Sequence, residues 1–353
     1  MLSTPLVEAH RAAGANLGEW LGCVLPSDFG DWRAEYRSAN ESVALLDKTY
    51  RAYLSFTGPD RVRYLNAILT NNIKDLKTGE GIVSLFLNPQ GRIQAEIETY
   101  AERDRLFCVS FAMIRERLVS ALDHFIIMDD VTLADESTRY GTLALEGPLS
   151  LAIVKRLTGV DLASLPELGW TESAVAPVSC RITRRSSRGV AGAEFLSEQS
   201  HLAALWNVLL EAATSHGGRP AGYKALSALR LEAGIPWFGY DFGEKQIPHE
   251  AGLEHSHISY VKGCYTGQEI VERVRSRGQV NRVRAMFKLS AADLPPAETP
   301  ILFAGKEVGF VTRSAESPAF HSVIAMGYIR REQSIPGTEL RIAGTAATVI
   351  SPR

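Results

Sequence analysis

The spacing of apolar residues predicts two copies of one local design, in which a strand runs through a Gly-Pro turn into a helix. In the first copy, residues 51–56 alternate as a strand does, and residues 61–69 place their apolar side chains on one helical face. In the second copy, residues 143–146 form the strand, and residues 149–157 carry apolar side chains at positions i, i+4 and i+8. The repetition indicates an internal duplication, and therefore two related lobes of mixed α and β structure.

Other segments follow the same two periods. Further strands are predicted at 82–87, 92–100, 106–111, 180–182 and 193–196, and further helices at 113–125 and 202–213. The first two of these strands flank a turn and form a hairpin. Residues 8–14 and 31–46 look helical or turn-rich, and the stretch 162–177 has no clear period.

The C-terminal region has a different pattern. From residue 280, apolar side chains alternate with arginine and lysine, and short strands separated by Gly and Pro turns continue to the end of the chain. This pattern predicts a small antiparallel barrel or sandwich of about seventy residues, which is within the usual size of a domain.

Composition limits the class of protein. A chain of 353 residues exceeds what one core usually fills, so two or three domains are expected. Hydrophobic residues make up 45% and charged residues 22%, as in an ordinary soluble globular protein. The net charge of -2 gives no general attraction to nucleic acid or to an anionic membrane, so neither is an expected partner.

The cysteines and the N-terminus indicate the compartment. Cys23, Cys108, Cys180 and Cys264 lie far apart without a C-x-x-C pair, which argues against a zinc site or a disulfide framework. The N-terminus lacks the layout of a signal peptide, so we expect a cytoplasmic protein. The segment 249–257 is rich in histidine but lacks the H-E-x-x-H spacing, and no metal site is predicted.

One cysteine lies in a segment that favours reactivity. Gly263 and Gly267 flank Cys264 and can take backbone angles closed to other residues, so the chain can bend there and present the thiol beside a helix over 268–275. Lys262 supplies a nearby cation, and cations and helix N-termini both favour the thiolate. A buried structural cysteine is the alternative, and this segment alone leaves both open.

Three segments together resemble a known family. They are Arg230-x-Glu232-x-Gly234-x-Pro236, Pro248-x-Glu250-x-Gly252-Leu253 and Lys262-Gly263-Cys264-Tyr265-x-Gly267-Gln268-Glu269. This set resembles the signature of the YgfZ-type folate-binding proteins, which are relatives of the glycine cleavage T-protein. The resemblance extends over most of the chain, from Asp47 to the C-terminal strands.

The resemblance implies a fold and a cofactor. The fold would be α+β, a T-protein-like ring of three domains with two related α+β lobes and a C-terminal antiparallel β-barrel. The first lobe is expected at 1–135, completed by 222–279, the second at 136–221, and the barrel at 280–353. Tetrahydrofolate or a one-carbon derivative would lie in the central opening.

The same resemblance implies contacts to folate. Glu194 matches the glutamate with which T-proteins bind the pterin ring, because a carboxylate accepts two parallel hydrogen bonds from a ring N–H and an exocyclic amine. An exposed strand carboxylate is the alternative. Arg230 matches an arginine along the folate site, with an ion pair to Glu232 or Glu250 as the alternative. Asn72 matches an amide that suits a polar ligand or a buried turn equally well.

The predicted hairpin departs from the T-protein pattern. Where T-proteins carry paired aspartates, this chain has Ala95 and Glu96, so the second carboxylate is kept but moved by one methylene. Glu96 is thus a candidate catalytic and folate-binding residue. Because misplacement of a reacting group by about 1 Å can cost roughly a hundredfold in rate, the change counsels against efficient aminomethyl transfer.

The sequence therefore predicts a tetrahydrofolate-binding accessory protein of iron-sulfur cluster assembly or repair rather than a true aminomethyltransferase. Cys264 would be its reactive or cluster-contacting thiol, and its partners would be folate and iron-sulfur assembly or client proteins. The supporting motif consists of Lys262, Gly263, Tyr265, Gly267, Gln268 and Glu269. One alternative is a folate-dependent aminomethyltransferase, or one-carbon transferase, of the glycine cleavage type. The other is a non-catalytic module that docks a partner through the arginine-rich run 273–288.

Overall fold

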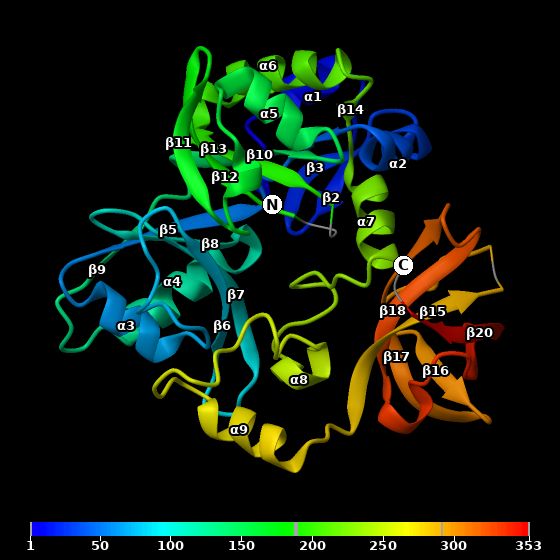
Figure 1. Ribbon diagram of the computed structural model, residues 1–353. Coiled ribbons are helices and arrows are strands. Elements are labelled where there is room, and N and C mark those ends of the chain that lie inside the picture. The colour runs from blue at the N-terminus through cyan, green and yellow to red at the C-terminus, as the bar shows by residue number, and fades with distance from the viewer. Residues whose placement is uncertain (1, 187–189, 291, 352–353) are drawn as a thin grey trace. The chain divides into compact units, whose positions relative to one another are not determined.

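The computed structural model describes residues 2–186, 190–290 and 292–351 (Figure 1). The contacts of the chain divide it into two compact units, and neither unit is one continuous stretch. Unit 1 comprises residues 1–67, 71–84 and 96–226, and unit 2 comprises residues 68–70, 85–95 and 227–353. Among the described residues, no helix is long and apolar enough to cross a membrane.

A five-stranded sheet of order β6-β7-β8-β5-β9 belongs mainly to unit 1. Its strands are β5 (Arg51–Thr57), β6 (Gly81–Leu87), β7 (Ile93–Ala101), β8 (Leu106–Phe111) and β9 (Thr132–Asp135). The four strands predicted between residues 51 and 111 are thereby confirmed. The hairpin of β6 and β7 has its base in unit 1, whereas its tip, residues 85–95, belongs to unit 2.

Alternation along β5 gives this sheet two different faces. Phe56 points to one face, where its ring centroid lies 5.9 Å from that of Tyr64. The Tyr64 hydroxyl donates a hydrogen bond to the Leu122 carbonyl, so two helices cover this face side by side (Figure 1). They are α3 (Arg61–Ile68) and α4 (Arg115–His124), as the pattern predicted. Arg51 and Tyr53 point to the opposite face.

A second sheet of unit 1 has six strands in the order β11-β12-β13-β10-β4-β14. Its strands are β4 (Ala44–Asp47), β10 (Tyr140–Glu146), β11 (Trp170–Val175), β12 (Val178–Arg184), β13 (Gly192–Glu198) and β14 (Arg219–Pro220). Among the described pairings of this sheet, only that of β14 with β4 is parallel. Two expectations are corrected here: 44–47 is a strand rather than helical or turn-rich, and the segment without a clear period contains β11.

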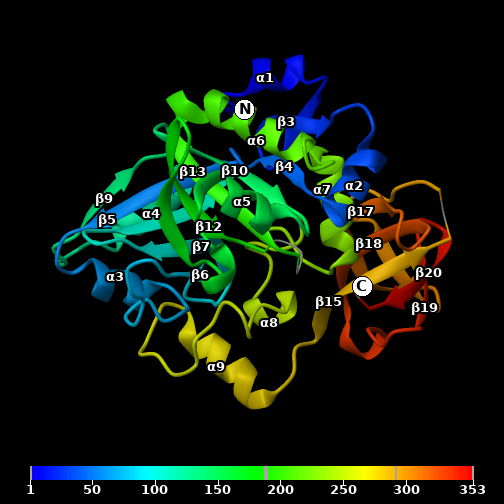
Figure 2. The same cartoon turned by 45° about the horizontal axis from the view of Figure 1, so that its top comes forward.

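Apolar side chains on one face of the six-stranded sheet form a core of unit 1. Leu143, Leu145 and Phe195 from the strands pack there with Ile153 and Trp206, all of them buried. The last two come from the helices α5 (Ser150–Thr158) and α6 (Leu202–Thr214), which lie along this face (Figure 1; Figure 2). The strand, Gly-Pro turn and helix of the second predicted copy are therefore present, as are those of the first.

The N-terminal segment forms a small sheet that the apolar spacing does not predict. Its strands β1 (Leu2–Ser3), β2 (Asn16–Trp20) and β3 (Cys23–Asp28) have the order β1-β3-β2, and the helices α1 (Val7–Ala12) and α2 (Trp32–Glu41) accompany them. A buried hydrogen bond of 2.8 Å joins Nε2 of His10 in α1 to Oδ2 of Asp47 in β4. The segment is thus attached to the six-stranded sheet through this polar contact and through Leu6, which is buried in the core of that sheet.

Unit 2 contains a closed barrel with strand order β15-β18-β17-β16-β19-β20, and all its pairings are antiparallel. The strands are β15 (Arg282–Leu289), β16 (Pro300–Phe303), β17 (Lys306–Ser317), β18 (Ser322–Arg330), β19 (Glu339–Ile342) and β20 (Thr345–Ile350). Phe287, Val311 and Ile329 are fully buried inside it. The predicted mixed lobes and C-terminal barrel are confirmed.

Three helices precede the barrel, namely α7 (Tyr223–Glu232), α8 (Pro248–Ala251) and α9 (Gln268–Arg277). Within unit 2, Arg313 of β17 contacts the segments around them. Its guanidinium lies 2.8 Å from Oδ2 of Asp241 and donates to the Ser227 carbonyl at 3.1 Å. Since Arg313 and Asp241 are both buried, Arg313 is a polar anchor that joins the barrel to Asp241 and, through Ser227, to α7. Four single 3-10 turns, at Ala112–Ile114, Leu162–Ser164, Gln199–His201 and Arg331–Gln333, complete the described helical segments.

Candidate functional site

Charged side chains gather between the facing strands of the two large sheets of unit 1. They alternate in sign, and each lies within 4 Å of an opposite charge. We call them the ion cluster, and its members are Lys48, Arg51, Glu98, Glu146, Arg185 and Glu194. Three carboxylates face three cations, so the cluster is balanced in charge.

Arg51 and Glu194 form the central pair of the ion cluster. Nη1 of Arg51 lies 2.5 Å from Oε2 of Glu194, and Nη2 lies 2.8 Å from Oε1. Glu194 is only 4% exposed, so the expected alternative of an exposed strand carboxylate is wrong. Such a bidentate pair is strong and fixes the plane of the carboxylate.

Glu98 of β7 is the second buried carboxylate. Oε1 of Glu98 lies 2.7 Å from Nη2 of Arg185 and 3.9 Å from Nη2 of Arg51, and the Tyr100 hydroxyl donates to Oε2 at 2.8 Å. Burial by itself would raise the pKa of Glu98, but the charges of Arg185 and Arg51 and the hydrogen bond from Tyr100 outweigh it and lower the pKa to about 2. Glu98 is therefore an anion at every physiological pH.

Lys48 completes the cluster between β4 and β5. Its ammonium lies 2.6 Å from Oε1 of Glu146 and 3.7 Å from Oε1 of Glu194. Burial opposes its charge, yet Glu146, Tyr50 and Glu194 together raise its pKa above the ordinary lysine value. Lys48 thus stays protonated and holds two carboxylates at once.

Aromatic rings line the space beside these charges. The Tyr53 and Phe107 rings are stacked with centroids 6.1 Å apart, and the Arg181 guanidinium lies over the rings of Tyr100 and Phe107 at 4.3 and 4.6 Å. The hydroxyl groups of Tyr53 and Thr142 are hydrogen-bonded at 2.8 Å across the two sheets. Flat side chains and fixed carboxylates thus lie next to one another on the inner faces of unit 1.

Glu96 lies on the same face of β7 as Glu98, because residues two apart along a strand share a face. Glu96 is half-buried, whereas Glu98 and Tyr100 are buried. Solvent access along this face of β7 therefore decreases from residue 96 to residue 100. Ala95, which stands at the position of the first aspartate of the T-protein pair, points to the other face and is fully buried.

Asn72 stabilises its own turn in unit 1. Its side-chain nitrogen donates to Oδ2 of Asp75 at 2.7 Å, and its side-chain oxygen accepts from the Lys74 backbone N–H at 3.1 Å. Both functions of the amide therefore have local partners, as in an Asx turn. The sequence left open whether this amide binds a polar ligand or stabilises a turn, and its contacts are those of a turn.

Arg230 belongs to unit 2, where it contacts the loop after α7. Its Nη2 donates to the Pro236 carbonyl at 2.7 Å, and its guanidinium lies 4.9 Å from the centre of the Trp237 ring. Glu250, one of the partners expected for it, lies 3.0 Å from Nε of Arg282 and 3.4 Å from Nη1 of Arg92.

The cysteine-bearing segment also belongs to unit 2. Cys264 is exposed, whereas the other three cysteines are buried, so the alternative of a buried structural cysteine at 264 is wrong. Lys262 donates to the Leu69 carbonyl at 2.5 Å and lies over the Tyr265 ring at 5.0 Å. Burial lowers the pKa of Lys262 to about 8 and raises that of Tyr265.

The two glycines of this segment differ. Gly267 has φ +82° and precedes α9, as expected, and a Cβ there would meet the Asn88 carbonyl oxygen at 2.6 Å. Gly263 does not have a left-handed backbone and has open space around it, so its predicted special role in the turn is wrong. Gln268 and Glu269 form the first turn of α9, where Glu269 is exposed.

The predicted residues thus fall into two groups. Glu194, Glu96 and Asn72 belong to unit 1, and only Glu194 is a member of the ion cluster. Arg230 and the segment 262–269 belong to unit 2. The described residues contain no group of three or more His, Cys, Asp or Glu side chains placed to hold a metal ion.

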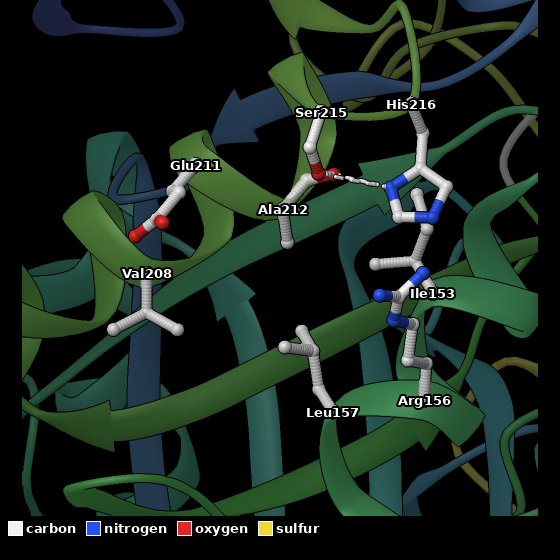
Figure 3. Close-up of a pocket in the computed structure, with 8 residues that line it drawn as sticks. All are labelled: Ile153, Arg156, Leu157, Val208, Glu211, Ala212, Ser215 and His216. Atoms are coloured by element: carbon white, nitrogen blue, oxygen red, sulfur yellow. Dashed lines mark hydrogen bonds between the residues drawn. The ribbon is translucent and has the colours of Figure 1, made fainter.

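A separate pocket of about 270 Å³ opens between α5 and α6, on the helix side of the six-stranded sheet (Figure 3). Its floor is apolar, and the polar side chains of Arg156, Glu211 and His216 stand at its edge. None of the residues predicted for the site lines this pocket. His216 is held in place by a hydrogen bond from its ring to the Ala212 carbonyl at 2.8 Å.

Of the ion cluster, only Glu194 was predicted from the sequence as a site residue. Arg51, Glu98 and Glu146 lie in strands that were predicted, and a charge at a core-facing position of a strand is the signal that could have identified them. Arg185 follows β12 and Lys48 follows β4, and neither stands in a recognisable motif.

Two family models match the chain and together cover nearly all of it. The "GCVT N-terminal domain" matches residues 6–257, and the "Glycine cleavage T-protein C-terminal barrel domain" matches residues 282–352. The second match coincides with the barrel of unit 2, which begins at β15.

Curated proteins and a solved structure are similar along the whole chain. An aminomethyltransferase of Moorella thermoacetica is 31% identical over 350 residues, which is 96% of this chain and 93% of that protein. One of Halothermothrix orenii is 29% identical, with 97% and 95% covered. The structure of glycine cleavage system aminomethyltransferase T from Bartonella henselae has a TM-score of 0.88 at 24% identity, with 99% of this chain and 96% of that chain covered, and shows the same fold.

Proposed function

The chain belongs to the glycine cleavage T-protein family, and we propose that it is a folate-dependent aminomethyltransferase. The observation that carries this proposal is the end-to-end match to curated aminomethyltransferases, at 31% identity for the Moorella protein. Matches to both the N-terminal domain and the C-terminal barrel domain of the family support it.

This conclusion corrects the function predicted from the sequence. We expected an accessory protein of iron-sulfur cluster assembly in which Cys264 was the reactive thiol, and we expected it not to be a true enzyme. The curated relatives over nearly the full chain are aminomethyltransferases, which overturns both expectations. Nothing in the comparisons supports iron-sulfur partners. Placement in the YgfZ-type branch stays a prediction from the segment 262–269.

Tetrahydrofolate is the cofactor of this reaction class, as the sequence predicted. It supplies the nitrogen that accepts the one-carbon unit. The side chains of unit 1 suit such a molecule once Arg51 leaves Glu194, because they offer a buried acceptor carboxylate and nearby aromatic rings. Glu194 would hold the pterin edge through two parallel hydrogen bonds.

Glu96 is the candidate for proton handling. It is half-buried, so substrate and solvent can reach its carboxylate, while Glu98 two residues further is enclosed by Arg185 and Tyr100. A partly exposed carboxylate can orient a nitrogen of the cofactor and take up a proton, and it typically contributes a hundredfold or more to the rate. The change from aspartate to glutamate moves this group by one methylene but keeps its chemistry.

The test is an anaerobic assay of folate-dependent ammonia release from aminomethylated dihydrolipoamide. We expect turnover by the wild-type protein, a loss of about a hundredfold in kcat for Glu96→Gln, and weakened folate binding for Glu194→Gln. Glu198→Gln is the control, because Glu198 is exposed at the end of the same strand as Glu194. Folate binding without any ammonia release by the wild type would refute the transferase.

Several finer expectations stay predictions. Arg230 and Asn72 as folate contacts, the domain boundaries at 135, 221 and 280, and the cytoplasmic location are among them. The alternative of a docking module through residues 273–288 has little support, because Arg282 is paired with Glu250 and Arg284 donates to the Ala251 and Gly234 carbonyls.

A further inference from the structure

Arg51 occupies the positions on Glu194 that a pterin would need. Both nitrogens of its fork donate to the two oxygens of the carboxylate, at 2.5 and 2.8 Å. The edge of a pterin formed by its ring N–H and exocyclic amine presents the same two parallel donors. Because two forks cannot share one bidentate position, the pterin and Arg51 exclude each other there.

Glu98 is a second carboxylate close enough to pair with Arg51. Nη2, which donates to Glu194, is already 3.9 Å from Oε1 of Glu98. A hydrogen bond from nitrogen to oxygen is made at roughly 2.7–3.2 Å, so a displacement of about 1 Å would complete the exchange. Glu98 is held in place by Arg185 and Tyr100 and need not move.

The exchange leaves no buried charge alone. After it, Lys48 still lies 3.7 Å from Glu194 and 2.6 Å from Glu146, while Arg51 and Arg185 share Glu98. A pterin edge is neutral, so the cluster keeps three carboxylates and three cations. Breaking a buried pair is costly chiefly when one partner is left unpaired, and here neither is.

We propose that Arg51 is a positioning residue that competes with the pterin for Glu194 and passes to Glu98 when the ligand binds. The inference rests on the proposed function, because it takes Glu194 as the pterin-binding carboxylate. Its consequence is specificity: a ligand must bring two parallel donors to displace the guanidinium, and a ring with a single donor cannot. Arg51 thus weakens the binding of every ligand that uses the Glu194 carboxylate, and it rejects rings that lack the amine.

The experiment measures dissociation constants by anaerobic calorimetry with three probes. They are tetrahydrofolate, a tetrahydropterin without the tail, and p-aminobenzoylglutamate, which is the tail without the ring. For Arg51→Met we expect both pterin probes to bind about tenfold tighter, and the tail fragment to be unchanged. In an Glu194→Gln background the same substitution should give no gain, since the competition has then been removed.

Two further variants separate this role from a structural one. Arg51→Lys keeps the charge on a single nitrogen, which cannot form two parallel hydrogen bonds with a carboxylate, so it should give an intermediate gain in affinity. It replaces Arg51→Met in the experiment if that variant does not fold. Arg139→Met removes an arginine that pairs with Glu198 at 3.1 Å outside the cluster, and it should leave all three constants unchanged. Thermal unfolding of each variant reports whether the fold is kept.

The outcomes distinguish the two proposals. Wild-type binding that Glu194→Gln weakens, together with unchanged or weaker binding by both Arg51 variants, would overturn the competition and leave the transferase standing. Absence of pterin binding by the wild type and by both Arg51 variants, together with absence of turnover, would overturn the proposed function itself.

Discussion

Replacing Glu98 by glutamine should lower the free energy of unfolding at neutral pH. The size of this loss should decrease as the pH falls. The charges of Arg185 and Arg51 hold the folded pKa of Glu98 at about 2, against an ordinary value of 4.5. A carboxyl group with a lowered folded pKa contributes stability that is complete above its unfolded pKa and is lost as the pH falls through its folded pKa. The relevant window is therefore about pH 4.5 to 2.

The size of the effect follows from this difference. Each unit of pKa difference corresponds to about 1.4 kcal/mol, so the difference of about 2.5 units between unfolded and folded Glu98 contributes roughly 3 kcal/mol to the free energy of unfolding at pH 7. At pH 3 only about 1.4 kcal/mol of this remains, because the unfolded carboxyl is then almost fully protonated. The gap in unfolding free energy between wild type and Glu98→Gln should shrink accordingly.

Urea unfolding followed by tryptophan fluorescence measures this gap. Four of the five tryptophans, Trp20, Trp32, Trp170 and Trp206, belong to unit 1, so the signal reports the unit that contains Glu98. Glu198→Gln is the matched control, because exposed pairs are worth less than about 1 kcal/mol and should show little dependence on pH. A gap of equal size at pH 7 and pH 3, or no gap at all, would refute the reasoning.

Two further predictions concern contacts within unit 2. Gly267→Ala should cost more than about 1 kcal/mol of unfolding free energy, since φ is +82° and the new Cβ would meet the Asn88 carbonyl, whereas Gly263→Ala should change it by less than about 0.5 kcal/mol. Equal effects in denaturant titrations would show that the backbone at 267 is not constrained. Arg313→Met should cost about 3–5 kcal/mol, because it leaves Asp241 buried without its cation, and a loss below about 1 kcal/mol in the same titrations would contradict this.

The spacing of apolar residues was sufficient to predict a helix or strand where that element buries one face. The strands at 51–56 and 143–146 and the helices after them were predicted because their apolar residues repeat with the period of the element. The N-terminal sheet was missed because β2 has no buried residue and because a single apolar residue, Leu6, and the buried contact of His10 with Asp47 attach the segment to the core. A polar contact between residues 37 apart leaves no periodic signal.

The site shows the same limit. Glu194 was identified through its resemblance to a pterin-binding segment, but Arg51, 143 residues away, pairs with it only because β5 and β13 face each other. A sequence pattern reports neighbours along the chain, whereas charge pairing between two sheets depends on their packing. The predicted function was wrong for a different reason. The Cys264 segment and the Ala95-Glu96 pair both favoured an accessory protein, whereas the similarity to aminomethyltransferases extends along nearly the whole chain.

The hairpin of β6 and β7 has a consequence for how the chain can be made. Two contacts of its tip are made with residues far downstream: the Ile93 N–H donates to the Gln246 carbonyl, and Arg92 pairs with Glu250. During synthesis, residues 85–95 therefore leave the ribosome long before the segment that completes their hydrogen bonds. A nascent chain halted before Ser227 would hold most of unit 1 with an unsupported hairpin tip, so truncation at that point should yield a protease-sensitive loop rather than an independent domain.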